Sequence, residues 1–307
     1  MSVLDRDRRV FVVLNPRSGV GSALYLKEDV LAGLRGLDVR YSFLGRGDRL
    51  RVMVDAALEA GANEVVAVGG DGTVSGVAEA VAGTDAAMGI VPTGTANMVA
   101  RELGIPLSIA SATGVIRRRE RIVGMDCMTS GDRSFVYQVA VGMGADLNRL
   151  VTRNEKEVLG RSAYMVAMFR ALGELRPLYA HCRIDGRQVE MWVNQLVIAN
   201  AGILGTEPLR LGPGIRPDDG KVEVVAMRGR GRLDYLSSGM SMVLGNFQDP
   251  GLRYYEVRHE VVLETRPRTA IKADGEYIGE TPLTLRVRPG AVKVITPTRP
   301  RTSWPPA

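Results

Sequence analysis

The sequence contains few residues of the types that many enzymes use in catalysis or to bind a metal. Among its 307 residues are two histidines, His181 and His259, and two cysteines, Cys127 and Cys182. So few histidines argue against a histidine-based triad and against a metal site built from several histidines. The cysteines lie far apart and lack the spacing of metal ligands, which favours reduced, buried thiols. Any acid–base chemistry therefore falls to carboxylates or lysines.

Long hydrophobic runs and aromatic residues are also scarce. No apolar run approaches the roughly 20 residues of a membrane helix, and the apolar run near the N-terminus is too short for a secretory signal. Aromatic residues make up 5% of the chain and do not alternate with basic residues, as they would on a surface that stacks nucleic-acid bases. We therefore expect a cytoplasmic protein without a nucleic-acid partner.

Positive charge is in excess, with a formal net charge of +6. Arginines cluster at 117–119 and again at Arg228, Arg230 and Arg232. Such clusters suit phosphate-rich partners, including nucleotides and anionic lipid surfaces. Taken alone, either cluster is explained more simply by a solvated loop, so charge by itself does not identify the partner.

The first 121 residues alternate short apolar strands with helical patterns. This alternation predicts parallel βαβ units, and so an α/β domain with helices on both faces of a parallel sheet. Asp48 is placed to cap the second helix. The expected strands are Val10–Leu14, Val39–Leu44, Val65–Val68 and Met88–Val91, and the expected helices are 22–35, 48–60, one that ends near Val81 and one at about 97–103.

The pattern changes after Arg121, where strand-like segments follow one another with turns between them. We expect an antiparallel, β-sandwich-like second domain over residues 122–298, interrupted by one helix at about 155–175. Its last strand, about 290–297, is expected to pack back on the first domain, and residues 299–307 to form a disordered tail. The expected strands are 133–141, 179–184, 189–199, 221–227, 254–265, 268–273, 283–287 and 291–296.

A glycine cluster, Gly69-Gly70-Asp71-Gly72-Thr73, follows the third expected strand. Ligands of parallel sheets bind beyond the carboxyl ends of the strands, where glycines admit the ligand and the next helix directs N–H groups at an anion. The loop is neither a P-loop nor a complete dinucleotide fingerprint. Asp71 would repel a bare phosphate, so it suits a phosphate that binds with Mg²⁺, or an oriented catalytic group. Capping of the following helix is the simpler alternative.

Two other strand ends carry similar loops. Residues 15–19 (NPRSG) follow the first strand, and residues 92–97 (PTGTAN) follow the fourth. Each loop offers backbone N–H groups together with hydroxyl or amide side chains. Three such loops at one edge of a sheet predict a polyphosphate site.

The patterns N-P-x-S-G, G-G-D-G-T and P-x-G-T-x-N, in this order and spacing, resemble the diacylglycerol kinase catalytic family, which includes bacterial lipid kinases and the sphingosine and ceramide kinases. Residues 200–225 and 271–297 look like the core and the closing segment of the family's second domain. The resemblance covers nearly the whole chain. It implies an N-terminal domain of the NAD kinase and phosphofructokinase type, a C-terminal β-sandwich, and a cleft between them.

The resemblance also implies ATP-dependent phosphorylation of a lipid hydroxyl with Mg²⁺. It implies that Glu276, in the turn Asp274-Gly275-Glu276, is the base for the hydroxyl, and that Asp71 supports the phosphates and Mg²⁺. The nucleotide-binding residues that it implies are Asn15, Pro16, Arg17, Ser18, Gly19, Gly69, Gly70, Asp71, Gly72, Thr73, Val74, Ser75, Thr93, Gly94, Thr95 and Asn97.

For a bound metal, the resemblance implies a Mg²⁺ site at Asp219, completed by the backbone carbonyls of Arg216 and Lys221. Judged by the residues alone, the turn at 218–220 and the turn at 274–275 are both plain hairpin turns.

The chain departs from the family pattern at several positions. Ser75 and Gly76 stand where the family often has Asn and Glu, and Met98 stands where bacterial members often have Asp. A threonine expected near the end of the second strand is not evident. We expect these departures to affect substrate or rate rather than fold.

Two rival interpretations stay open. An NAD kinase would explain GGDGT, but not residues 15–19 or the turn at 274–276. A catalytically weak member that only binds a nucleotide or a lipid would explain the departures.

A lipid substrate requires contact with a membrane. We expect a reversible, peripheral association with the inner face of the membrane, made by the arginine clusters and by an apolar-rich helix at 159–178. Packing of this helix on the β domain is the simpler alternative, and a homodimer stays open. The apolar residues of the helix include Met165, Met168, Phe169, Leu172 and Leu175.

Overall fold

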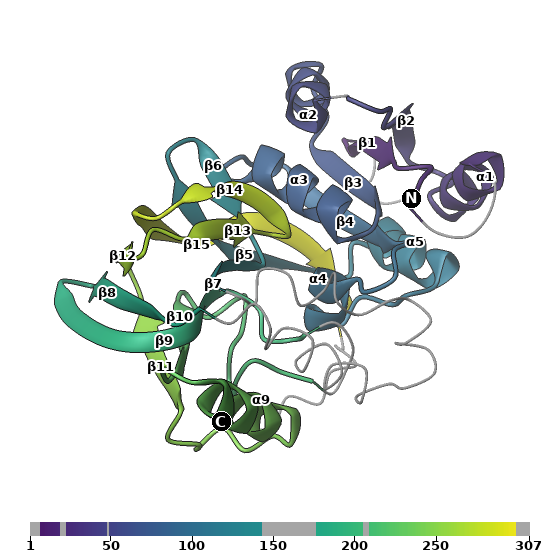
Figure 1. Cartoon of the computed structure of the whole chain (residues 1–307). Coiled ribbons are helices and arrows are strands. Elements are labelled where there is room, and N and C mark those ends of the chain that lie inside the picture. The colour runs from purple at the N-terminus through teal and green to yellow at the C-terminus, as the bar shows by residue number, and fades with distance from the viewer. Residues whose placement is uncertain (1–6, 19–22, 48, 143–175, 205–208, 299–307) are drawn as a thin grey trace.

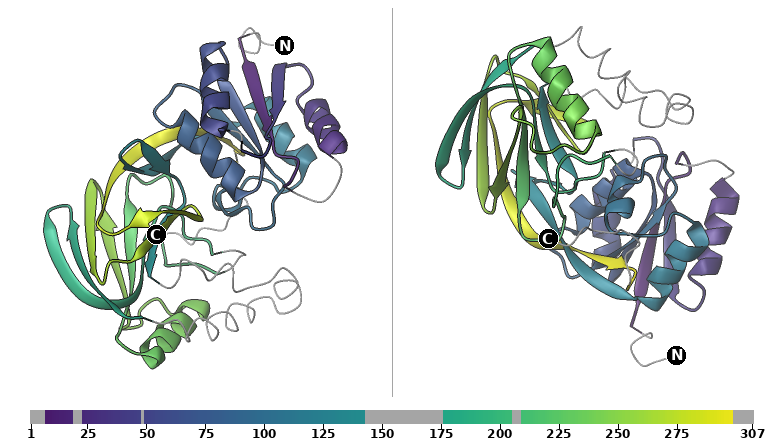
Figure 2. Two further views of the ribbon diagram at one scale, coloured as in Figure 1. Left: turned by 45° about the horizontal axis from the view of Figure 1, so that its top comes forward. Right: turned by 90° about the horizontal axis from the view of Figure 1, so that it is seen from below.

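The N-terminal part of the chain forms a parallel sheet with helices on both faces (Figure 1, Figure 2). The computed structural model describes residues 7–18, 23–47, 49–142, 176–204 and 209–298. The elements of this part are β1 (Arg9–Leu14), α1 (Ala23–Gly33), β2 (Asp38–Phe43), α2 (Leu50–Glu59), β3 (Glu64–Gly69), α3 (Asp71–Val81), β4 (Ala87–Pro92), α4 (Met98–Glu102) and α5 (Ile109–Arg118). The order β4-β3-β1-β2 places β3 and β4, which are buried along their whole length, toward the centre of the sheet. Helix α1 packs with α5, and α2 with α3.

The predicted α/β architecture is confirmed, with two local differences. Helix α2 has Arg49 at its N-cap position, and Arg49 makes no side-chain cap; Asp48, predicted as the cap, lies outside the described residues. The sequence also failed to predict α5. Thr113 and Gly114 weaken the helical pattern in its middle, although Ser108 caps it by accepting a hydrogen bond from the N–H of Ser111.

The C-terminal part is antiparallel, as predicted. Its elements are β5 (Arg121–Ser130), β6 (Arg133–Phe135), β7 (Gln138–Gly142), β8 (Leu178–Ile184), β9 (Arg187–Ala199), β10 (Val222–Arg228), α9 (Arg232–Val243), β11 (Leu252–Val257), β12 (Glu260–Arg266), β13 (Ala270–Ala273), β14 (Glu276–Glu280) and β15 (Leu283–Thr296). The helix predicted at 155–175 and the tail predicted at 299–307 lie outside the described residues. Within the described ranges, no helix is long and apolar enough to cross a membrane.

The strand predicted at 254–265 is two strands, β11 and β12. Asp185 makes the break, because its carboxylate accepts hydrogen bonds at 2.8–2.9 Å from the consecutive N–H groups of Arg258, His259 and Glu260. Those N–H groups are therefore satisfied by a side chain rather than by a neighbouring strand. Strand β14 and helix α9 were not predicted either.

Strand β15 connects the two parts of the molecule. Its first half pairs antiparallel with β12, and at Lys293 and Val294 it pairs in parallel with β4. A register shift between Arg288 and Val292 lets one strand replace the two segments predicted near the C-terminus. One continuous sheet therefore runs from β2 to β14, and the cleft described below lies along it.

A buried carboxylate on α4 ties the N-terminal part to the loop after β9. Glu102 is 2% exposed and accepts hydrogen bonds from the N–H groups of Gly202 (3.1 Å) and Ile203 (2.8 Å), and from Arg210 (2.9 Å). Burial raises the pKa of Glu102, and Arg210 and the two N–H groups oppose that rise. The position of α4 is thus fixed from the β-rich side.

Replacing Glu102 with alanine is expected to lower the free energy of unfolding by about 2–4 kcal/mol, because it removes the acceptor of two buried N–H groups and the carboxylate that pairs with Arg210. Urea denaturation measures the change. Asp55→Ala is the control, since Asp55 pairs with Arg51 on the exposed face of α2 and its loss is expected to cost less than about 1 kcal/mol. Equal losses in the two variants would contradict the role given to Glu102.

Candidate active site

Three loops meet at the carboxyl edge of the parallel sheet, after β1, β3 and β4. The N–H of Thr93 donates to the carbonyl of Gly69 at 3.0 Å. Asn15 Nδ2 donates to Thr73 Oγ1 at 2.9 Å, and Thr93 Oγ1 donates to Ser18 Oγ at 3.1 Å. The side chains that the sequence assigned to a ligand therefore hold the three loops together before any ligand binds.

The loops after β3 and β4 approach so closely that they require glycine. A Cβ atom on Gly94 would lie 2.6 Å from the Cα of Gly70, far inside normal contact distance. Gly70 has φ of −88°, so the requirement is for space rather than for a left-handed backbone. Backbone N–H groups of both loops can consequently reach one ligand.

A cleft of about 560 Å³ opens over these loops, and its lining joins residues from both ends of the chain. Glu276, at the start of β14, faces the same space as the three loops that the sequence assigned to the nucleotide. The lining residues are Asn15, Arg17, Ser18, Leu44, Gly70, Asp71, Gly72, Thr73, Thr93, Gly94, Thr95 and Glu276.

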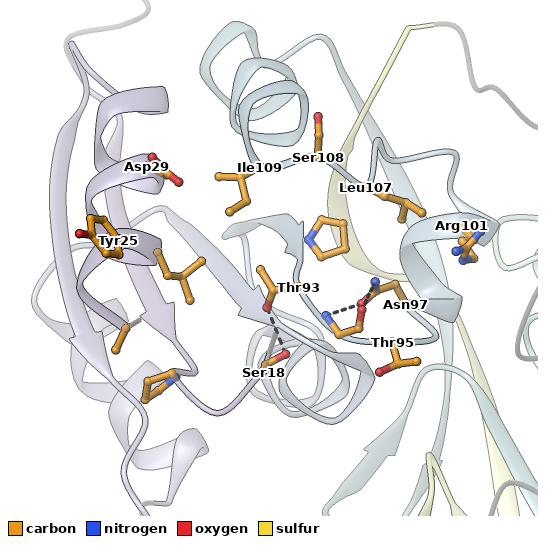
Figure 3. A pocket seen from close by; sticks show the side chains of 15 residues that line it. Ser18, Tyr25, Asp29, Thr93, Thr95, Asn97, Arg101, Leu107, Ser108 and Ile109 are labelled. Atoms are coloured by element: carbon orange, nitrogen blue, oxygen red, sulfur yellow. Dashed lines mark hydrogen bonds between the residues drawn. The ribbon is translucent and has the colours of Figure 1, made fainter. Parts of the chain in front are cut away.

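A second hollow of about 500 Å³ adjoins the cleft and shares Ser18 and the loop after β4 with it (Figure 3). Its other wall comes from α1 and from the start of α5, including Tyr25, Leu26 and Ile109. Pro16 and Asn97, predicted at the nucleotide, line this hollow rather than the cleft. Sequence analysis missed the wall residues, because exposed apolar residues on helices give no signal of a site.

Not every predicted residue reaches the cleft. Gly19 lies outside the described residues. Val74 is 3% exposed and belongs to the core below α3, and Gly69 ends β3 beneath the loop. Neither Val74, Gly69 nor Ser75 is among the residues lining the cleft or the hollow.

Asp71 caps a helix, but not the helix that follows it in the chain. Its Oδ1 accepts a hydrogen bond at 2.6 Å from the N–H of Met98, at the start of α4. Burial raises the pKa of Asp71, and the N–H groups of Met98, Val99 and Asn97 oppose that rise. Asp71 therefore fixes the third loop to the second, and it also lines the cleft. Its predicted support of phosphates and Mg²⁺ stays a prediction.

The two acidic residues of the turn at 274–276 differ in environment. The carboxylate of Asp274 accepts hydrogen bonds at 2.9–3.0 Å from the N–H groups of Val136, Tyr137 and Gln138. Desolvation nevertheless raises the pKa of Asp274, against these donors and the hydroxyl of Ser75. Asp274 is therefore committed to holding the turn, and Ser75, one of the departures from the family pattern, contacts it.

Glu276 is free to face a ligand. Its side chain is 74% exposed, and its one described ion pair is with Arg133 of β6, at 3.5 Å. Arg133 also donates to Glu79 of α3 at 2.6 Å, so it lies between two carboxylates from different elements. Nothing in the sequence indicated Arg133, because its partners lie far away along the chain.

Comparison with known proteins assigns the chain to a family. Residues 9–129 match the model of the diacylglycerol kinase catalytic domain, and residues 137–296 match the YegS C-terminal NAD kinase beta sandwich-like domain. The chain belongs to the diacylglycerol kinase family. It is therefore a lipid kinase of the diacylglycerol kinase type.

Two relatives of similar length carry names of this family. The chain is 30% identical over 304 residues to a Pseudomonas savastanoi protein named "Probable lipid kinase YegS-like", covering 95% of this chain and 94% of that protein. It is 28% identical over 301 residues to a Mycobacterium tuberculosis diacylglycerol kinase, covering 94% and 95%. It is also 30% identical to an uncharacterized Synechocystis protein, of which it spans 54%.

A solved structure shares the fold. The crystal structure of a diacylglycerol kinase from Bacillus anthracis superposes with a TM-score of 0.76 at 20% identity, covering 95% of this chain and 98% of that one. At this identity the likeness supports the fold alone.

The metal site that the family implies can be tested against the turn before β10. Asp219 Oδ1 is buried and finds no hydrogen-bond partner among the described residues, and burial raises the pKa of Asp219. The described part of the chain holds no group of three or more His, Cys, Asp or Glu residues arranged for a metal. A single unpartnered carboxylate oxygen fits a hard cation with oxygen ligands, which does not need such a group.

The contrast between Asp274 and Glu276 predicts different effects on stability. Asp274→Asn is expected to lower the free energy of unfolding by about 1–3 kcal/mol, because an amide NH₂ would oppose backbone N–H donors. Glu276→Gln, at an exposed position, is expected to change it by less than about 0.5 kcal/mol. Denaturant titration of both variants is the check, and an unchanged Asp274→Asn variant would refute the anchoring role.

Proposed function

We propose that the protein transfers the γ-phosphate of ATP to the hydroxyl of diacylglycerol or a related lipid, with Glu276 as the general base. The observation that carries the proposal is the position of Glu276 in one cleft with the three glycine-containing loops. Phosphoryl transfer depends mainly on positioning and on charge neutralisation, and this cleft offers both.

The loops are suited to hold the triphosphate. Helix α3 begins at Asp71, directly after Gly70, so its free N–H groups and positive dipole end point into the cleft. Arg17 lines the same cleft and adds a positive charge. The adjoining hollow, walled by Tyr25, Leu26 and Ile109, would take the nucleoside.

Glu276 is suited to take the proton of the lipid hydroxyl. As the hydroxyl oxygen forms its bond to the γ-phosphorus, the bond from phosphorus to the bridging oxygen of ADP breaks and the proton passes to the carboxylate. Arg133 pairs with the Glu276 carboxylate at 3.5 Å, and Asp274 anchors the turn from which Glu276 extends. Such fixation keeps the base near the acceptor oxygen.

Magnesium would act in two places. Bound with the phosphates, Mg²⁺ would neutralise their charge. Asp71, the carboxylate within the loop after β3, lines the cleft and would support this ion. A separate Mg²⁺ would bind Asp219 with the carbonyls of Arg216 and Lys221, and would steady the turn before β10.

The direct test is transfer of labelled γ-phosphate from ATP and Mg²⁺ to a panel of lipids in mixed micelles, with NAD in a parallel reaction. Label in one lipid supports the proposal and names the substrate. Label in NAD alone would assign the protein to NAD kinases. ATP binding without label anywhere would identify a non-catalytic member, and Ser75, Gly76 and Met98 would then be the first positions to restore.

Glu276→Gln is expected to lower turnover by about 10²–10⁴-fold while nucleotide binding persists, because the amide cannot accept the proton. Steady-state kinetics and calorimetric titration with ATP measure the two effects. Glu280→Gln, at the exposed end of the same strand, is the control and should retain activity. A Glu276→Gln variant with wild-type turnover would remove Glu276 from the role.

Mg²⁺ without nucleotide is expected to raise the melting temperature of the wild-type protein, because a ligand of the native state adds about 2.7 kcal/mol of stability at a hundred times its Kd. Asp219→Asn is expected to abolish this increase. Asp218→Asn is the control, since Asp218 pairs with Arg216 instead. An equal increase in wild type and Asp219→Asn would contradict the assigned ligand.

A further inference from the structure

Helix α9 exposes apolar side chains on the face that points away from the protein. Leu233 and Leu244 are 81% and 75% exposed. Leu244, at the C-cap, is eleven positions after Leu233, which is close to three full turns, so the two share one face with the half-buried Met240. The opposite face buries Tyr235 and Met242 in the apolar core. Helix α9 is therefore apolar on both sides.

Three arginines lie beside the start of this helix. Arg228, Arg230 and Arg232 are exposed, and the Arg230 guanidinium lies 4.6 Å from the ring centre of the partly exposed Trp192. None of the three forms an ion pair within the part of the chain that the structure describes. Their charges are therefore available to a partner.

The other arginine cluster differs in this respect. Arg118 pairs with Glu120 at 2.6 Å, and Arg119 pairs with the buried Glu64 at 3.4 Å. Two charges of the cluster at 117–119 are thus paired with carboxylates of the protein itself. The two arginine clusters look alike in sequence but differ in the structure in how many of their charges are paired.

An open groove of about 710 Å³ runs between Trp192, Arg228, Arg230 and the first turns of α9. The carboxylates in the groove, Asp234 and Asp249, accept hydrogen bonds from backbone N–H groups. They are committed to local structure, whereas the arginines are not. Figure 1 and Figure 2 place α9 at the end of the β-rich part that is remote from β1 and β2.

We propose that this surface, formed by Trp192, Arg228, Arg230, Arg232, Leu233 and Leu244, docks on a bilayer that contains anionic phospholipids. The leucines would enter the headgroup boundary, the indole would lie at headgroup depth, and the arginines would contact phosphates. The combination of free cations with outward leucines favours a bilayer over nucleic acid, which would leave the leucines in water. The inference deepens the proposed function, because a lipid substrate resides in such a bilayer.

The test is co-sedimentation with vesicles of phosphatidylcholine alone, or of phosphatidylcholine and phosphatidylglycerol at about 7:3. The wild-type protein is expected to bind the mixed vesicles and to be released at about 1 M salt, where charges are screened within about 3 Å. Arg228→Gln/Arg230→Gln/Arg232→Gln is expected to weaken binding about 100-fold, since each arginine near an anionic surface contributes about a factor of five.

Two further variants make the test specific to this surface. Leu233→Ser/Leu244→Ser keeps every charge and is expected to weaken binding at least about tenfold. The control, Arg183→Gln/Arg258→Gln/Arg286→Gln, removes the same charge from arginines that are paired with Glu260 or Glu256, and is expected to change binding less than about threefold.

Several outcomes would overturn the proposal. Equal losses in the two arginine variants would mean that net charge alone drives binding. Full binding by the leucine variant would exclude insertion of α9, and equal binding to neutral vesicles would exclude recognition of anionic lipid.

Failure of this inference is distinguishable from failure of the proposed function. Turnover on a short-chain, water-soluble diacylglycerol does not require a bilayer. The docking variants are therefore expected to keep wild-type turnover on it, and to lose turnover on substrate presented in mixed vesicles. No turnover of the soluble substrate by the wild-type protein would refute the proposed function, whereas vesicle binding would still decide the docking surface.

Discussion

Buried backbone N–H groups must find acceptors, and in this protein four carboxylates supply them at places where distant segments meet. Asp71 holds the start of α4, and Glu102 holds its end against the loop after β9. Asp274 holds the link between β6 and β7 under the turn that carries Glu276. Asp126 joins the turns at Gly220 and Gly290 in the same way. These four acids hold together segments that lie far apart along the chain, including two of the loops that border the cleft.

This arrangement changes how the acidic residues of the motifs are understood. A carboxylate inside a phosphate loop suggests a metal or a catalytic group, yet Asp71 already has a structural partner at Met98. Of the two acids in the turn at 274–276, Glu276 is the exposed one, while Asp274 is engaged with three N–H groups. Membership of a motif therefore does not distinguish a reacting group from a supporting one. The burial of each carboxylate and its hydrogen-bond partners make that distinction.

Sequence predicted the features that depend on local backbone chemistry. Glycine-rich loops at strand ends and period-two alternation can be recognised in the sequence itself. The parallel sheet, the antiparallel half and the loops around Gly70 and Gly94 could therefore be predicted. Contacts between distant segments could not be predicted, because no local sequence pattern indicates them. Arg133 beside Glu276 and Glu102 beside Gly202 are such contacts. Strand β14 and helix α9 were missed because short or doubly apolar segments have no clear period.

The shared strand β15 has a consequence for biosynthesis. Until Lys293 and Val294 emerge from the ribosome, β4 has no neighbour on one side, although nearly all of the 307 residues have been made. The nascent N-terminal half therefore carries an open strand edge through most of translation, the kind of edge that pairs with other chains. The N-terminal sheet is therefore completed only when the C-terminal strand is added. Chains truncated before β15 would keep β4 exposed and would be prone to aggregation or proteolysis.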